Sequence, residues 1–147
     1  MPLPILARCI DEVRDHVRHQ TYILGDPASG KTTTALQLSD SITHTDDLLA
    51  LYRSSGIDAV YARTGETRVV EGTLCHRLLL ESGARPATII LVRRPRAAMR
   101  LSYIERGSDI GLMMRLRRDR IAMWAQIYEQ HQLLPDYDPQ IIELHLP

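Results

Sequence analysis

Short apolar runs recur along the chain and are separated by stretches whose hydrophobic positions have helical spacing. Residues 21–24 and 88–92 are the clearest runs, and the second is continuous, as is typical of a parallel strand covered on both faces. Shorter runs predict strands at residues 41–44, 69–72 and 140–144. Helix-compatible segments lie between these runs. The pattern therefore predicts an α/β fold: a three-layer sandwich with a mainly parallel, five-stranded sheet.

Two other segments depend on the same pattern. Residues 4–19 carry apolar side chains at three- and four-residue spacing, which predicts an amphipathic helix. We expect this N-terminal helix, within residues 1–19, to pack onto the sheet as an added element. Residues 57–67 are compatible with a hairpin or with a loop over the substrate, and the pattern does not decide between them. Residues 112–131 show one further helical stripe.

Length and composition indicate one ordinary globular domain spanning residues 1–147. No apolar run approaches the ~20 residues that cross a bilayer, and the N-terminus lacks a signal-peptide pattern. We therefore expect a cytoplasmic protein with no membrane partner. Cys9 and Cys75 fall on expected apolar helix faces and are expected to be reduced core thiols. The oligomeric state stays open.

Residues 25–32 fit G-x-x-x-x-G-K-[ST], the phosphate-binding loop or Walker A motif, at every fixed position. Glycines let successive N–H groups curl around an anion, and the following helix adds its N-terminal amides and positive dipole end. Lys31 is expected to reach the β- and γ-phosphates of ATP, and the Thr32 hydroxyl is expected to bind Mg²⁺. The expected nucleotide contacts are Gly25, Asp26, Ala28, Ser29, Gly30, Lys31, Thr32 and Thr33.

Basic residues are distributed unevenly, although the formal net charge is zero. Lys31 is the single lysine among 18 basic residues, which favours a requirement for an amine at this position. Residues 93–120 contain nine arginines against three acidic residues, an excess of six positive charges. A solvated helical face is the usual meaning of such a run. Beside a triphosphate, however, the run favours a lid that clamps the anion.

Chemically suitable residues follow several of the expected strands. Asp46 and Asp47 follow one strand, Glu71 lies at the end of another, and Arg93 and Arg94 follow a third. Because ligands of open α/β sheets bind at the carboxyl ends of the strands, these residues predict one site. Phosphoryl transfer requires a carboxylate to deprotonate the acceptor, an acidic group near Mg²⁺, and positive charge on the phosphoryl group. With Lys31 the sole lysine, the guanine-reading Asn-Lys-x-Asp motif of GTP switches is excluded.

Three segments resemble the uridine kinase and nicotinamide riboside kinase branch of P-loop kinases, over roughly residues 20–145. Residues 44–47 resemble the catalytic-aspartate segment, residues 69–72 the apolar-Glu-Gly strand end, and residues 100–109 the Arg-rich lid helix. In place of the aromatic residues that commonly follow the family's Asp, this chain has Leu48 and Leu49.

This resemblance implies roles for individual residues. Asp46 would be the general base, Glu71 a ligand of Mg²⁺-bound water or of substrate, and Arg100 and Arg106 lid groups on the phosphates. Asp47 and Arg93 are further candidate substrate contacts. Structural alternatives remain for each of them: Asp47 could cap the following helix, Asp46 could be a solvated acid, and Glu71 could be structural. The clamp could also come from Arg93, Arg94 or Arg96 instead.

Three functions remain open. The leading hypothesis is an ATP-dependent phosphotransferase acting on a hydroxyl of a nucleoside- or nucleotide-like small molecule. A second acceptor is a hydroxymethylated pyrimidine within DNA, as phosphorylated by small P-loop kinases of some phages; the excess of arginine near the site is compatible with it. The third is a nucleotide-binding regulator that transfers no phosphate.

Overall fold

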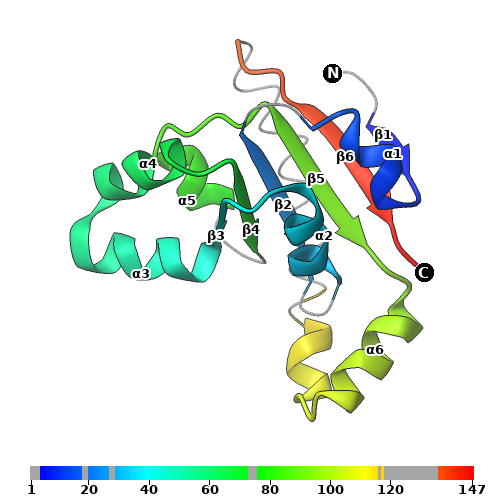
Figure 1. The fold of residues 1–147 in the computed structure, drawn as a ribbon. Coiled ribbons are helices and arrows are strands. Elements are labelled where there is room, and N and C mark those ends of the chain that lie inside the picture. Colours follow the sequence, from blue (N-terminus) through cyan, green and yellow to red (C-terminus); the bar gives the residue numbers. More distant parts are fainter. Residues whose placement is uncertain (1–3, 18–19, 27–28, 73–75, 116, 118–135) are drawn as a thin grey trace.

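The computed structural model describes residues 4–17, 20–26, 29–72, 76–115, 117 and 136–147 (Figure 1). The strands are β1 (Ile5–Ala7), β2 (Thr21–Gly25), β3 (Ile42–His44), β4 (Val69–Gly72), β5 (Thr88–Arg93) and β6 (Gln140–His145). The helices are α1 (Ile10–Arg14), α2 (Lys31–Leu38), α3 (Thr45–Ser55), α4 (Ile57–Gly65), α5 (His76–Glu81) and α6 (Arg96–Glu105). Residues 110–115 are also helical.

All of the described strands join one parallel sheet in the order β1-β6-β5-β2-β4-β3. The expected α/β class and parallel sheet are therefore confirmed. The expected count of five strands is wrong, because β1 adds a sixth at one edge. The strands expected at residues 41–44, 69–72, 88–92 and 140–144 correspond to β3, β4, β5 and β6, each within one residue at either end.

The N-terminal segment differs from the single helix expected over residues 4–19. Ile5–Ala7 pair with residues 142–144 of β6, and the helical part is limited to α1. A three-residue strand is too short to show its period of two, so its apolar residues fit a helical pattern by coincidence. Cys9 lies exposed at the N-cap of α1, so the expected core thiol is wrong there. Cys75 lies outside the described residues.

Residues 57–65 form the helix α4, where neither a hairpin nor a loop is found. Gly56, at φ +87°, separates α3 from α4 in a backbone conformation that favours glycine. Val60 and Thr64, four residues apart, are the buried side chains of α4. The Thr64 hydroxyl is 2.8 Å from the Tyr61 carbonyl oxygen, to which it donates. Short helices with one narrow buried stripe give a weak sequence signal.

Helices cover both faces of the sheet, which confirms the three layers (Figure 1). One face packs against α1 and α2, and its buried side chains are Ala7, Val13, Ile23, Ala35, Val69, Ile90, Val92, Ile142 and Leu144. On the other face α3, α4 and α5 surround Tyr22, Leu48, Val60, Val70, Leu79 and Ala84. Burial raises the pKa of Tyr22 well above its ordinary value, against a smaller opposite effect of Arg85, so this hydroxyl stays neutral.

The Arg-rich segment begins with Arg93, the last residue of β5. Helix α6 extends beyond the carboxyl edge of the sheet (Figure 1), and residues 110–115 pack back on it through Ile110, Met113 and Met114. Of the helix expected over residues 112–131, only residues 112–115 and 117 are described, and they are helical. In the described part of the chain, no helix is both long enough and apolar enough to cross a bilayer.

Shortening a core side chain in the central sheet should reduce stability strongly. Ile90 of β5 is fully buried, so Ile90→Ala should lower the free energy of unfolding by about 2–5 kcal/mol. Leu101 on α6 is 60% exposed, and Leu101→Ala should change the free energy of unfolding by about 0.5 kcal/mol or less. Urea unfolding of both variants measures the difference. Equal losses would contradict the assignment of Ile90 to the core.

Candidate functional site

The glycine-rich loop follows the central strand of the sheet. β2 lies between β4 and β5, and the chain leaves β2 toward β3 and β4 before it crosses to β5 and β6. The carboxyl end of β2 is therefore the point where the strand order reverses. In open α/β sheets this is where ligands bind.

Two glycines of the loop are required for different reasons. Gly30, the N-cap of α2, has φ +93°, a left-handed conformation that other residues adopt only under strain. Gly25 has no space for a side chain: a Cβ there would lie 2.5 Å from Ser29 Oγ and 3.1 Å from the Val92 carbonyl oxygen. The described ends of the motif are thus tightly constrained, Gly25 where the chain leaves β2 and Gly30 where α2 begins.

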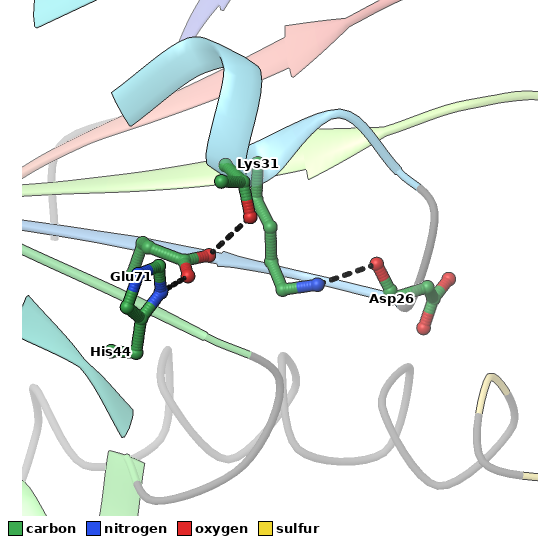
Figure 2. A network of polar contacts seen from close by, with 5 residues as sticks. Asp26, Lys31, His44 and Glu71 are labelled. Carbon is green, nitrogen blue, oxygen red and sulfur yellow. Dashed lines mark hydrogen bonds and ion pairs between the residues drawn. The ribbon is translucent and has the colours of Figure 1, made fainter. Parts of the chain in front are cut away.

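Lys31 is the first residue of α2, and its side chain turns back over the loop. Its Nζ donates to the carbonyl oxygen of Asp26 at 3.2 Å (Figure 2). The Asp26 side chain is buried, and its Oδ2 lies 3.6 Å from Nε of Arg117. Asp26 therefore contacts two positively charged groups: Lys31 at its main-chain carbonyl and Arg117 at its side-chain carboxylate.

Thr32, Glu71 and His44 form one polar network across three elements, and Figure 2 labels Glu71 and His44. Thr32 Oγ1 donates to Glu71 Oε2 at 3.3 Å, and His44 Nδ1 contacts Glu71 Oε1. The β3–β4 register places His44 directly opposite Glu71. Glu71 is only 4% exposed, so its carboxylate requires these partners. Each of its oxygens faces a different group.

Two of these oxygens, Thr32 Oγ1 and Glu71 Oε2, are near enough to each other to be ligands of one metal ion, should one bind here. Two adjacent ligands of an octahedral Mg²⁺, each about 2.1 Å from the metal, lie about 3.0 Å apart. Thr32 Oγ1 and Glu71 Oε2, at 3.3 Å, are close to that separation. Among the described residues, no three His, Cys, Asp or Glu side chains group as a metal site. Mg²⁺ bound with phosphates needs only one or two protein carboxylates, the remaining ligands being phosphate oxygens and water.

Asp46 and Asp47 lie in the first turn of α3, directly after β3, and both are exposed. The N-cap of α3 is His44, so Asp47 does not cap this helix as the alternative interpretation proposed. Thr45, which is 2% exposed, packs against Gly72, next to Glu71. The residue before Asp46 is thus packed against the end of β4, which holds the start of α3 in place.

The candidate arginines separate into anchored and exposed side chains. Arg93 is ion-paired with Glu143 of β6, with 2.7 Å between Nη2 and Oε1. Arg94 donates from Nη1 to Ser102 Oγ at 3.2 Å. Arg100 on α6 and Arg106 at its C-cap are exposed. Arg117, which the sequence analysis did not single out within its arginine run, contacts the loop through Asp26.

A cleft of 640 Å³ adjoins the loop at the carboxyl ends of β1, β2, β5 and β6. Its lining residues are Arg8, Asp26, Arg93, Arg94, Pro95, Arg117, His145, Leu146 and Pro147. Arg8 and His145 were missed by the sequence analysis, because residues 4–19 were expected to be a helix and residue 145 lies past the last expected strand. The cleft is therefore more basic than the sequence pattern indicates.

The other expected nucleotide contacts lie in or beside the same loop. Thr33 is exposed in the first turn of α2. Ser29 is buried, and its Oγ has no hydrogen-bond partner among the described residues. Ala28 lies outside the described part of the chain.

No protein-family model matches the chain, and no curated protein matches it significantly. Function is therefore argued from the residues and their geometry.

The contact between Gly25 and Ser29 gives a test of the loop. Gly25→Ala introduces a Cβ 2.5 Å from Ser29 Oγ, which should lower the free energy of unfolding by about 1–3 kcal/mol. Ser29→Ala removes that oxygen and leaves the Ser29 Cβ at 3.4 Å, so the double variant should recover part of the loss. Urea unfolding of the four proteins measures the coupling. Strictly additive effects would show that the two residues do not meet in this way.

Proposed function

We propose that this protein is an ATP-dependent phosphotransferase that moves the γ-phosphoryl group to a hydroxyl of a nucleoside- or nucleotide-like acceptor. The observation that carries the proposal is the Thr32–Glu71 hydrogen bond. It joins the first turn after a glycine-rich loop to a carboxylate on the neighbouring strand. A loop that merely caps a helix does not require a buried acid beside its threonine.

The loop and the N-terminus of α2 would bind the phosphates. Amides at a helix start carry partial positive charge and point toward an anion. The Lys31 ammonium, which lies over the loop, adds a full charge. Thr32 and Glu71 would hold Mg²⁺, which when bound neutralises charge on the phosphate oxygens.

Asp46 is the proposed general base. It is exposed at the carboxyl edge of the sheet, where an acceptor could approach it. Its role is to accept the proton that the acceptor hydroxyl loses when it is phosphorylated. Asp47, one residue further on, and Arg93 remain candidates for binding the acceptor.

Arginines would neutralise the charge of the transferring group. The Arg117–Asp26 contact supports a role for Arg117, since it lies against the loop. Arg100 and Arg106 on the exposed part of α6 stay proposed lid groups, because an exposed guanidinium can reorient at little cost.

The exposed arginines also favour a second acceptor, a hydroxymethylated pyrimidine within DNA. Arg96, Arg100 and Arg106 are exposed on or beside α6, and Arg8 lies at the basic cleft. DNA bound through such groups releases counterions, so its affinity would fall steeply as salt rises. A small acceptor bound by hydrogen bonds would show a weaker salt dependence.

The acceptor can be identified with γ-labelled ATP and Mg²⁺. The three acceptor pools are free nucleosides, nucleoside monophosphates, and duplex DNA with or without hydroxymethylpyrimidines. We expect label in a small molecule, and Lys31→Ala should reduce transfer by roughly 10²–10³-fold. Label confined to modified DNA would instead support the second acceptor. Tight ATP binding with no transfer to any pool would contradict the enzyme and favour a nucleotide-binding regulator.

The role of Asp46 can be tested with a matched aspartate. Asp58 is also exposed in the first turn of a helix, α4, so it has the same local setting away from the site. Asp46→Asn should lower kcat by roughly 10²–10⁴-fold, whereas Asp58→Asn should leave it unchanged. Steady-state kinetics on the preferred acceptor measure both. Full activity in Asp46→Asn would remove this residue from the mechanism.

A further inference from the structure

We propose that His44 is a positioning residue, which holds the Glu71 carboxylate in the orientation that meets Thr32. The inference rests on the proposed function, because the Thr32–Glu71 pair is the proposed magnesium site. It names a side chain to which the sequence motifs gave no role of its own.

Glu71 uses its two oxygens in different directions. Oε1 meets His44 Nδ1, while Oε2 accepts from Thr32 Oγ1 at 3.3 Å. A carboxylate can rotate about its last bond, and only rotations that turn one of its two equivalent oxygens toward Thr32 keep that hydrogen bond. An ionised carboxylate only accepts hydrogen bonds, so we take Nδ1 of His44 as the donor in the pair, with the ring proton on that nitrogen. Holding Oε1 therefore fixes where Oε2 points.

The main chain, rather than the ring itself, keeps His44 in place. A Cβ at Gly72 would lie 1.7 Å from Thr45 Oγ1, so Thr45 fills the space beside the end of β4. Thr45 is 2% exposed, whereas the His44 side chain is 49% exposed. Thr45, which follows His44, is thus packed tightly against Gly72, which follows Glu71. The Thr45–Gly72 packing, together with the pairing of His44 opposite Glu71, fixes where the ring meets the carboxylate.

Helix capping does not account for the ring. His44 occupies the N-cap of α3 but makes no side-chain capping bond. Its Nδ1 contacts Glu71 on the neighbouring strand β4, so the side chain interacts with β4 and not with its own helix. Since Asp46 lies two residues further on, the same junction links the proposed metal side of the site to the proposed base. Groups behind a metal ligand typically change metal affinity by about 10–100-fold when they are removed.

Three variants separate this role from a general effect on folding. His44→Ala and His44→Leu remove the donor, and the half-exposed ring makes at least the alanine variant compatible with folding. In His44→Asn the amide nitrogen stands close to the position of Nδ1 and keeps a donor. Urea unfolding of all three establishes that the comparison is made on folded protein.

The readout is the binding of a non-hydrolysable ATP analogue, measured by calorimetry with Mg²⁺ and with EDTA. In the wild type, Mg²⁺ should strengthen binding. In His44→Ala and His44→Leu this enhancement should fall by roughly 10-fold or more, while affinity in EDTA stays within about twofold of the wild type. His44→Asn should retain most of the enhancement.

The outcomes distinguish the two proposals. An unchanged Mg²⁺ enhancement in His44→Ala would overturn the role of His44 and leave the proposed function standing. Equal weakening with and without Mg²⁺ would also overturn it, because a structural role affects both conditions alike. A wild-type protein that binds no nucleotide, or binds it without any effect of Mg²⁺, would overturn the proposed function, and the inference with it.

Discussion

Parallel pairing of every described strand is the constraint on which the site depends. Since all strands run the same way, the segments that follow them emerge at one edge of the sheet. β2 is paired on both sides, by β4 and β5, and its residues are buried throughout. The loop after it therefore starts from a rigid and fully covered strand. Gly25, tight against Ser29 and the Val92 carbonyl, fixes the exit of the chain from that strand.

Glu71 connects this loop to the rest of the edge. A buried carboxylate is costly unless it is hydrogen-bonded, and Glu71 has partners on two other elements. Those partners, Thr32 and His44, belong to the helix after β2 and to the end of β3. Its position thus depends on three elements that are distant in sequence and adjacent in the sheet. A network of this kind, with all members partnered, restricts the relative placement of those elements.

Sequence patterns predicted more of the fold than of the candidate site. Continuous apolar runs such as residues 88–92 identify covered parallel strands, and the Gly-rich motif fixes the loop between β2 and α2. β1 was missed because a strand of three residues is recognised mainly by its partner, and that partner, β6, lies at the other end of the sequence. The contact of His44 with Glu71 depends on the register between β3 and β4, which hydrophobic pattern does not encode. The proximity of Arg117 to the loop depends on how a helical segment folds back, which local spacing also does not specify.

The arginines of the basic segment differ in what an incoming anion would have to displace. Arg93 is paired with Glu143, a mostly buried carboxylate that would lose its partner if the arginine moved away. It therefore forms part of the wall of the cleft. Arg117 is different, because its partner Asp26 belongs to the loop itself. A phosphate bound in the loop would compete with Asp26 for the same guanidinium. Arg117 could then exchange one anion for another without leaving its position, which makes it better placed than Arg93 to respond to an anion in the loop.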